Sequence, residues 1–546
     1  MRGLLAAAAF IAILLLQTPA CRAADVLSGT VSSQEEGAME GVVVSAKRDG
    51  ATITISVVSD AQGHYAFPET RLAAGQYAIT IRAGGYELAA PAAASVAPGR
   101  AARADIRLRQ ARNLSAQLSN TEWLLSMPGS DKQKSFLTGC TGCHTLERIA
   151  KSTHDAGEFL PIFDRMAGYY PGSMPIHPQR LQIMRGASFG PAMQASAEFL
   201  ASVNLSRATS WDYPLKTLPR PSGRATHVVI TEYDLPRRTM EPHDVVLDSD
   251  GIAWFSNFGE ASLGRLDPRT GEVKEYPIPE IKKGFPTGAL DLEPDQDGNL
   301  WVALMFQGGI AKFDRKSEKI STWSVPAEWQ SSRTQQSQMA PNFANVDGRI
   351  WVKNSEKNVI YRFDPAAGSF VNLGEPKDPK TGRALSPYGV IADHANNLWL
   401  LDYGAADVAK IDAKTHDITV YPTPTPNSKP RRGRIDQEDR LWFAEFGGNA
   451  VGMFDPKTQT IREWKVPTPW TVPYDVVLDG KGDAWTASMF SDHVTRLDTH
   501  SGDFVEYLLP RQTNMRRVFV EDRPDAVSFW AGSVHGASII KLEPLD

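Results

Sequence analysis

The chain has 546 residues, too many for a single hydrophobic core, so about three domains are expected. A formal net charge of −5 leaves no basic footprint, which excludes nucleic acid as an expected partner. Only three cysteines are present, so disulfides cannot be the main support of the fold. Frequent Gly, Pro and Trp within short alternating segments predict mainly β structure.

Residues 1–24 have the pattern of a secretory signal peptide. Arg2 precedes an apolar run from Gly3 to Leu16 that is too short to cross a bilayer, and small residues follow it. We therefore expect a periplasmic or secreted protein without a membrane span. Acylation of Cys21, as in a lipoprotein, is the disfavoured alternative, because Thr18-Pro19-Ala20 is a poor approach to such a cysteine.

A small β-sandwich is predicted for residues 25–112. Apolar or alternating segments at 29–31, 41–46, 51–55 and 75–81 have strand length and are separated by turn residues. The Ala- and Pro-rich stretch from Ala89 to Ala102 is expected to be a long loop within this domain.

The sandwich has a series of short motifs in a fixed order. They read G-x-V at Gly29, G-V-x-V-x-A from Gly41, D-x-x-G-x-Y-x-F from Asp60, and G-x-Y at Gly75. This order resembles the carboxypeptidase regulatory-like domain. The resemblance implies a binding or spacer unit without chemistry of its own, and it points to no ligand.

Cys140-Thr141-Gly142-Cys143-His144 is a C-x-x-C-H motif, the pattern of covalent haem c attachment. Both thiols can form thioethers to the haem vinyl groups, and the adjoining imidazole then becomes the proximal iron ligand. The alternative is a zinc or redox pair. Cys21 is the only other cysteine, so a four-cysteine zinc site has no second thiol pair. Because haem c is attached outside the bacterial inner membrane, the export signal supports one covalent haem c.

Helices are predicted around this motif, over 131–139, 145–151, 155–169 and 191–203. Their order resembles a compact class I cytochrome c, in which a Met between the last two helices is the sixth iron ligand. The resemblance implies electron transfer, with His144 and Met174 as the axial ligands.

The sixth ligand has competing candidates. Met174 lies in a loop ahead of Pro175, and a thioether is a soft, neutral ligand that raises the haem potential. Met166 lies on the apolar face of the preceding helix, where core packing is the default role for a methionine. His177 or an open position are the further alternatives.

A repeat predicts a seven-bladed β-propeller in the C-terminal part. Seven tryptophans recur at intervals of 43 to 50 residues, the period of four-stranded blades. The last repeat lacks an outer strand, and Val228–Pro236 matches the outer strands of the others, so we expect it to close the ring. The repeating residues are Trp254, Trp301, Trp351, Trp399, Trp442, Trp485 and Trp530.

Three segments of this part carry a further resemblance. Thr231–Pro236, Leu441–Glu445 and Ile461–Pro467 resemble the virginiamycin B (streptogramin) lyase family, whose blades read I-T-E-Y-x-x-P and L-W-F-T-E. The family opens a cyclic depsipeptide ester by elimination, with histidines, glutamates and Mg²⁺. The resemblance implies catalytic roles for Glu241, His243 and Glu445.

This constellation is incomplete. The second family histidine falls at Arg516, and the blade with His243 has Asn257 where the family has Glu. A base, an acid and a metal carboxylate are therefore not expected in one place, and Mg²⁺ is expected only if the lyase hypothesis holds.

Turns at one end of the predicted channel offer cationic and aromatic side chains beside His243. They suit a small anionic or aromatic ligand, although solvated arginines at a rim are the alternative interpretation. The residues are Tyr388, Arg431, Arg432, Tyr474, Arg516 and Arg517.

Three functions compete. The first is an exported electron-transfer protein with a periplasmic redox partner, the second a lyase on a depsipeptide or related ester, and the third a non-catalytic binding scaffold. The expected fold is mainly β. Its parts are a signal peptide (1–24), a β-sandwich (25–112), a short all-α cytochrome c domain (113–208) and a seven-bladed propeller (209–546).

Overall fold

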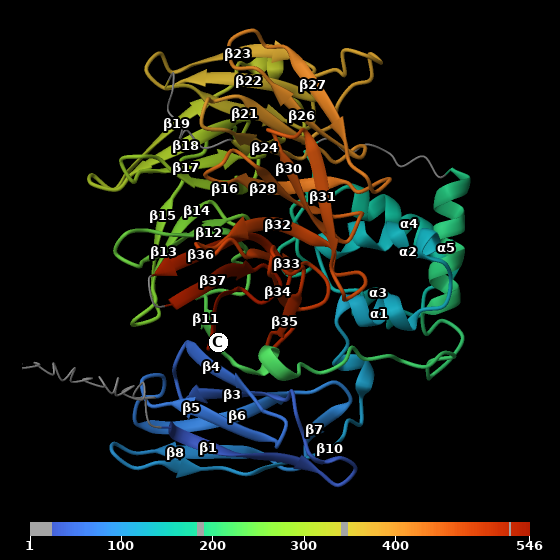
Figure 1. Ribbon diagram of the computed structural model, residues 1–546. Helices are drawn as coiled ribbons and strands as arrows, with labels where there is room; N and C mark the ends of the chain where they lie inside the picture. Colours follow the sequence, from blue (N-terminus) through green and yellow to red (C-terminus); the bar gives the residue numbers. More distant parts are fainter. Residues whose placement is uncertain (1–24, 183–189, 340–347, 524–525, 546) are drawn as a thin grey trace, which may run out of the picture.

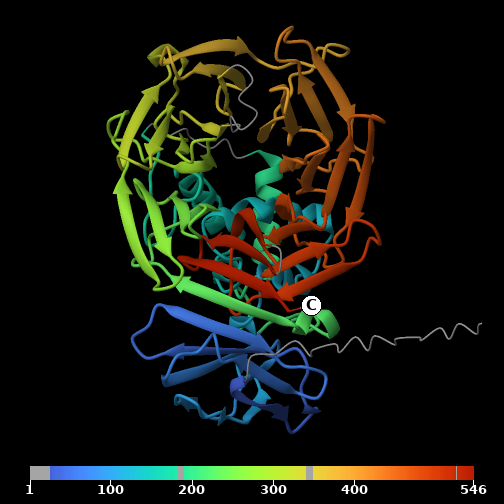
Figure 2. The ribbon, with the colours of Figure 1, turned by 60° about the vertical axis from the view of Figure 1, so that its left-hand side comes forward.

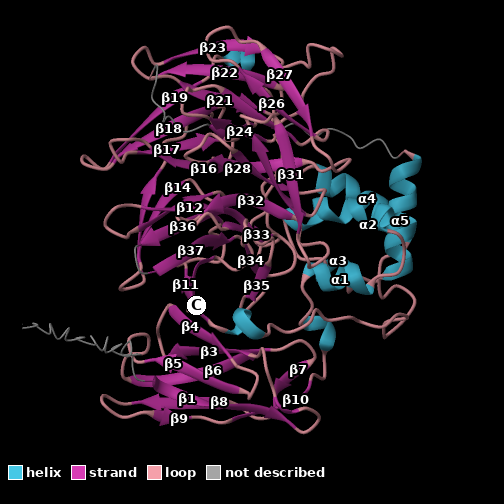
Figure 3. Cartoon of the chain, viewed as in Figure 1, coloured by secondary structure: helices cyan, strands magenta, loops and turns pink. Residues whose placement is uncertain are grey.

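The computed structural model describes residues 25–182, 190–339, 348–523 and 526–545 (Figure 1). The predicted signal peptide lies outside these residues. The protein is mainly β, with helices gathered in one module (Figure 3). No helix of the described ranges has the length and apolarity needed to cross a membrane.

The N-terminal domain is a sandwich of two sheets. One sheet joins β1 to β2, β5, β9 and β10, with β7 beyond β10, and the other runs β4-β3-β6-β8. The strands are β1 (Asp25–Ser33), β2 (Gly37–Ala38), β3 (Val43–Arg48), β4 (Ile53–Val58), β5 (His64–Pro68), β6 (Gly75–Arg82), β7 (Tyr86–Leu88), β8 (Ala92–Val96), β9 (Ala102–Arg103) and β10 (Ile106–Gln110).

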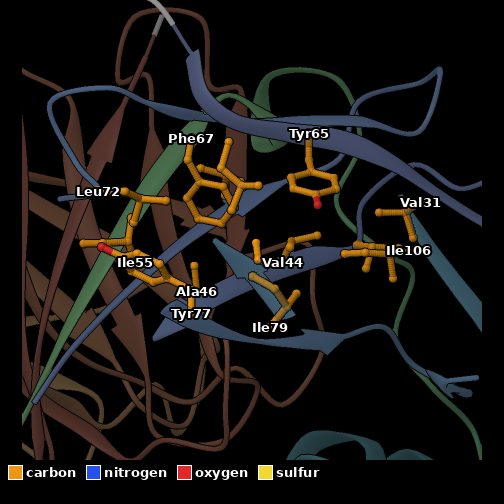
Figure 4. Packing of buried hydrophobic residues seen from close by; sticks show 14 of the residues in the cluster. Val31, Val44, Ala46, Ile55, Tyr65, Phe67, Leu72, Tyr77, Ile79 and Ile106 are labelled. Carbon is orange, nitrogen blue, oxygen red and sulfur yellow. The ribbon is translucent and has the colours of Figure 1, made fainter. Parts of the chain in front are cut away.

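Alternation along these strands builds the sandwich core. In β6, Tyr77 and Ile79 are buried and Ala78 is exposed, as expected for a strand with one face inward. The inward residues meet Val44 and Phe67 between the sheets (Figure 4). The expectation of one long loop from Ala89 to Ala102 is wrong, because β8 pairs with β6 and β9 pairs with β1 within it.

A helical module follows the sandwich. Its helices are η1 (Leu114–Ala116), α1 (Asn120–Ser126), α2 (Asp131–Lys134), η2 (Ser135–Gly142), α3 (Glu147–Ala150), α4 (Ala156–Ala167) and α5 (Pro191–Val203). Capping boxes start three of them, with Ser119, Ser130 and Asp155 as the N-caps. The four predicted helical ranges are found. Helix α1 was not predicted, although its capping box is visible in the sequence.

The C-terminal part is a ring of seven antiparallel sheets (Figure 2). The inner strands β12, β16, β20, β24, β28, β32 and β36 each contact the next, and β36 contacts β12, so the ring is closed. Two 3₁₀ helices, η3 (Gly223–Thr226) and η4 (Ala327–Trp329), lie in the connections.

From the inner to the outer strand, the first four sheets are β12 (Pro242–Leu247), β13 (Ala253–Asn257), β14 (Ser262–Asp267), β15 (Glu272–Pro277); β16 (Ala289–Pro294), β17 (Leu300–Leu304), β18 (Gly309–Asp314), β19 (Lys319–Ser324); β20 (Gln336–Met339), β21 (Ile350–Asn354), β22 (Val359–Asp364), β23 (Ser369–Gly374); and β24 (Gly389–Ala392), β25 (Leu398–Asp402), β26 (Asp407–Ile411), β27 (Ile418–Pro422). The other three are β28 (Pro430–Ile435), β29 (Leu441–Glu445), β30 (Ala450–Asp455), β31 (Thr460–Lys465); β32 (Pro473–Leu478), β33 (Ala484–Ser488), β34 (His493–Leu497), β35 (Phe504–Leu508); and β36 (Met515–Arg523), β37 (Ala526–Ser533), β38 (Ser538–Pro544), β11 (Val228–Asp234).

The tryptophan repeat has a physical cause. In five sheets the indole N–H donates to an Asp six residues earlier, as in Trp254 to Asp248 and Trp485 to Asp479, both at 2.8 Å. The same carboxylate accepts backbone N–H groups of its turn, such as that of Ile252. The repeated Trp therefore fixes the turn that joins the two innermost strands of its blade.

Strand β11 pairs on both edges. It completes the seventh sheet by pairing with β38, as predicted, with Ile230 opposite Leu542. Its other edge pairs with β4 of the sandwich, with Thr231 opposite Ile55. The last propeller blade and one face of the sandwich are thus one continuous eight-stranded sheet.

Ion pairs reinforce this junction. Lys47 meets Asp234 at 2.5 Å, Arg71 meets Glu543 at 2.8 Å, and Arg82 meets Asp492 at 2.7 Å. The last is the most enclosed, because the Asp492 side chain is 2% exposed and Arg82 also donates to the Leu509 carbonyl at 3.0 Å.

Replacing Arg82 with Ala leaves the Asp492 carboxyl buried without its cation. We expect the free energy of unfolding to fall by about 3 kcal/mol, as for other broken buried pairs. The matched control is Arg103→Ala, whose pair with Asp105 is exposed and should contribute about 1 kcal/mol or less. Thermal unfolding of both variants checks this, and equal losses would contradict the structural role of the junction.

Candidate functional site at the mouth of the propeller channel

The helical module packs on one end of the propeller channel (Figures 1 and 2). Trp123 and Leu200 of the module share one apolar cluster with Tyr474, Met489 and Phe490 of the propeller. A burial of this kind is the main driving force for holding two domains together. The module is therefore part of the channel mouth and not a separate appendage.

The segment after α4 covers the neighbouring blades. Tyr170 packs on Phe306 with ring centroids 4.6 Å apart, and its hydroxyl donates to the Ser332 carbonyl at 3.2 Å. Gly172 has φ +81°, and a Cβ there would lie 2.3 Å from Phe258. Only glycine allows the backbone to approach the propeller this closely.

The propeller holds the backbone of the C-x-x-C-H motif directly. Asn514 Nδ2 donates to the Thr141 carbonyl at 3.1 Å, and Arg516 Nη2 donates to the Gly142 carbonyl at 3.4 Å. Arg516 Nε donates to Asn514 Oδ1 at 2.6 Å, which locks the two propeller side chains together. The motif thus lies on the turn that precedes β36.

Both motif thiols are free and half-buried. Burial raises the pKa of Cys140 to about 11 and also raises the pKa of Cys143. His144 Nδ1 lies 3.0 Å from the Thr145 carbonyl, and burial lowers the pKa of the ring. The tautomer that donates Nδ1–H to this carbonyl leaves the Nε2 lone pair free for a metal.

The two candidate methionines lie in different surroundings. Met174 is 6% exposed, and it lies in a turn where the His177 N–H donates to the Met174 carbonyl at 3.0 Å. The backbone amides just before it, at Gly172 and Ser173, face the Cys143 thiol. Met166 is 39% exposed at the end of α4. Of the two methionines, only Met174 is buried and directly follows the backbone amides that face the Cys143 thiol.

Below the motif, a chain of hydrogen bonds runs into the channel. His243 Nδ1 lies 2.6 Å from Asp244 Oδ1, Tyr474 Oη lies 3.3 Å from His243 Nε2, and Tyr388 Oη lies 2.5 Å from Tyr474 Oη. Burial lowers the pKa of His243 to about 4, so the ring is neutral at pH 7. With Nδ1–H donated to Asp244, the Nε2 lone pair can accept the Tyr474 hydroxyl proton.

Arg432 and Arg517 lie inside the channel rather than on its rim. Arg432 pairs with Asp244 at 3.0 Å and with Asp291 at 2.6 Å, and Arg517 pairs with Asp244 and Glu293. Burial alone would raise the pKa of Asp244, but Arg432 and His243 hold it well below its ordinary value. These two arginines are committed to carboxylates of the chain itself.

The two candidate glutamates are buried but apart. Glu241 is adjacent to the His243 turn, and neither carboxyl oxygen has a hydrogen-bond partner, so burial raises its pKa to about 8. Glu445 ends β29 in another blade, where burial and the neighbouring Glu463 raise its pKa to about 9. Glu241 and His243 are two residues apart and both lie near Arg516, whereas Glu445 lies beside Glu463.

A magnesium site does not follow from these residues. Within the described ranges, no three His, Cys, Asp or Glu side chains gather in a way that could hold a metal ion. These side chains therefore do not fit a Mg²⁺ ion.

Two residues at the mouth were not predicted. Asn514 holds the Thr141 carbonyl of the motif, and His535 is half-buried, with both of its ring nitrogens shielded from solvent. Burial lowers the pKa of His535 to about 3, and the charges of Arg516 and His144 lower it further. Asn514 could have been found from the sequence, because it lies two residues before Arg516 in the turn that precedes an inner strand. No sequence signal marks His535.

The pKa of Glu241 leads to a prediction on stability. The neutral form is favoured in the folded state, so stability is lost as pH rises from the ordinary carboxyl range through 8. Between pH 5 and pH 9, the free energy of unfolding of Glu241→Gln should rise by on the order of 4 kcal/mol relative to that of the wild type. Unfolding at both pH values measures this, with exposed Glu272→Gln as the control. An unchanged difference would show that Glu241 is ionised in the folded protein.

Comparisons with known proteins match two parts of the chain. Residues 26–109 match the carboxypeptidase regulatory-like domain, and residues 283–542 match the virginiamycin B lyase family. Neither match includes residues 110–282, which hold the helical module and the His243 turn. No curated protein sequence matches the chain.

Among solved structures, a streptogramin B lyase is 20% identical with a TM-score of 0.50, and it covers 59% of this chain and 99% of its own. A catalytically inactive virginiamycin B lyase from Staphylococcus aureus with quinupristin is 21% identical with a TM-score of 0.49, over 58% of this chain and 99% of its own. At this identity the likeness concerns the fold alone. The chain thus carries a carboxypeptidase regulatory-like domain and, beyond the helical module, a virginiamycin B lyase-like propeller.

Proposed function

We propose that this protein is an exported electron-transfer protein with one covalent haem c on Cys140 and Cys143. The observation that carries the proposal is the C-x-x-C-H segment itself, with two free, half-buried thiols and a histidine next to them. Two thiols at this spacing, followed by a histidine, are the attachment pattern of haem c.

The donor set fits this cofactor. His144 directs Nδ1 to a backbone carbonyl, the arrangement that orients metal-bound histidines, and Met174 offers a buried thioether near Cys143. When bound, haem c supplies a one-electron couple whose potential rises with a thioether ligand. We propose that His144 and Met174 would be the residues that hold the haem iron.

The chain's own residues would position the motif and shield it. Asn514 and Arg516 hold the carbonyls of Thr141 and Gly142, so the propeller fixes the haem-binding turn. The loop with Met174 is held on the propeller by Gly172 and Tyr170. A propeller used in this way is a rigid platform, whose outer surface is left to bind a periplasmic redox partner.

Covalent attachment is directly testable. Protein made in a host with haem maturation machinery should keep its haem through denaturation and organic extraction, because thioether bonds survive both. The variant with Cys140→Ser and Cys143→Ser should lose it, whereas Thr141→Ser, which keeps both thiols and the histidine, should not. Purified wild-type protein without covalent haem would reject the electron-transfer function.

The axial ligand can be tested separately. Replacing Met174 with Ala should remove the weak far-red band of Met-ligated ferric haem and lower the midpoint potential by on the order of 0.1 V. Met166→Ala is the matched control and should change neither, because Met166 is 39% exposed at the end of α4. The reverse pattern would assign the ligand to Met166, and no change in either would leave His177 or an open position.

A C–O lyase acting on a cyclic depsipeptide or related ester is the second candidate. It is favoured by the His243–Asp244 pair, whose Nε2 lone pair faces the Tyr474 hydroxyl and can act as a proton acceptor, and by the lyase-like propeller. Against it, the helical module covers the channel mouth above these residues. A binding scaffold would remain if both chemistries failed.

The two functions separate in one assay. Incubation with quinupristin and Mg²⁺ should give no ring-opened product by mass spectrometry if the module closes the mouth. A product that disappears in His243→Ala would instead establish the lyase. The streptogramin B lyase serves as the positive control for the assay.

A further inference from the structure

Five arginines lie at the channel, on β28 and β36, and three of them are neutralised by the chain. Arg432 and Arg517 share Asp244, with further contacts to Asp291 and Glu293. Arg434 pairs with Asp475 at 3.0 Å. The remaining two are Arg431 and Arg516.

Arg431 is surrounded by aromatic rings instead of carboxylates. Its guanidinium carbon lies 4.2 Å from the ring centre of Tyr474, 4.4 Å from that of Phe446 and 4.6 Å from that of Tyr388. Nη1 lies 3.6 Å from the Met489 sulfur, and Nε has no hydrogen-bond partner. No carboxylate of the described residues forms an ion pair with it.

Arg516 has only neutral partners. Its contacts are the Asn514 amide oxygen and the Gly142 carbonyl, and its guanidinium carbon lies 5.6 Å from the Tyr474 ring centre. Glu241 lies near Arg516, but neither of its carboxyl oxygens forms a hydrogen bond, and burial keeps the carboxyl neutral by raising its pKa to about 8. Arg431 and Arg516 therefore face the same ring, both without an ion pair to a carboxylate of the described chain.

Two guanidinium groups in this state are costly. A buried cation needs an anion or a full set of acceptors, and cation–π contacts compensate only part of its lost hydration. A guanidinium presents parallel N–H donors that match a carboxylate. Arg431 and Tyr388 also keep partial exposure, so they are not sealed off from solvent.

We propose that Arg431 and Arg516 form a carboxylate-binding site at the channel mouth, directly below the C-x-x-C-H turn. One source of the carboxylate is a propionate of the haem, which rests on the function proposed above. The other is a small soluble carboxylate that enters the mouth, and this source is independent of that function.

Two variants, Arg431→Gln and Arg516→Gln, test the site. A third, Arg431→Lys, keeps the positive charge but lacks the parallel N–H donors of the guanidinium group. Arg462→Gln is the matched control, because Arg462 also stacks on a ring, that of Trp464 at 4.5 Å, but on an outer strand. Each protein is examined by redox titration of any bound haem and by calorimetric titration with benzoate.

With a propionate as the source, both Gln variants lower the haem midpoint potential, Arg462→Gln does not, and the haem-loaded wild type does not bind benzoate. With a soluble ligand as the source, benzoate binds the wild type and Arg462→Gln with similar affinity. It binds Arg431→Gln and Arg516→Gln at least tenfold more weakly. Arg431→Lys should give an intermediate effect in either case.

Unchanged potentials together with no benzoate binding would overturn the carboxylate site. If the purified protein carries no haem, the proposed function fails on that observation alone. The benzoate titration then decides the site: binding that depends on both arginines supports it, and the absence of binding overturns it.

Discussion

The double pairing of β11 is the constraint on which the rest of the architecture depends. This strand closes the propeller through β38 and joins the sandwich through β4. The helical module is the chain segment between β10, which lies in the other sheet of the sandwich, and β11, so its first end is tied to the sandwich and its last end to the continuous sheet. A segment anchored at both ends in this way has few places to pack, and it packs on the channel mouth.

The position of the helical module covers the end of the lyase-like propeller at which the candidate lyase residues lie. His243 and Glu241, the residues to which the lyase resemblance points, lie below a mouth closed by the motif and the loop around Gly172. Asp244 serves Arg432 and Arg517 as well as His243, so it is part of the charge balance that holds neighbouring blades together. The lyase-like propeller here holds the helical module and its C-x-x-C-H turn at the mouth of the channel.

Much of the fold was readable from the sequence because it depends on local signals. A Trp recurs in each blade, and in five blades its indole N–H donates to an Asp six residues earlier, as in Trp254 to Asp248. The helices of the module follow from capping boxes and apolar spacing. The pairing of β11 with β4 was not predictable in this way, since alternation specifies a strand but not its neighbour. The seventh blade was predicted because its missing strand had a visible match in the repeat.

The site was predictable in its residues more than in its geometry. The C-x-x-C-H motif and the cluster of arginines and tyrosines were found by type and position. Which arginines are neutralised depended on carboxylates from other blades, as for Arg432 and Asp244, which are 188 residues apart. No pattern in one sequence indicates such partners, nor does it show that Asn514 would hold the Thr141 carbonyl.

Anomalous diffraction at the iron edge, from crystals of the full mature protein, tests the central claim most directly. The account predicts one iron peak next to Cys140, Cys143 and His144, at the mouth of the propeller channel. A protein without iron, or a module found away from the channel mouth, would contradict it.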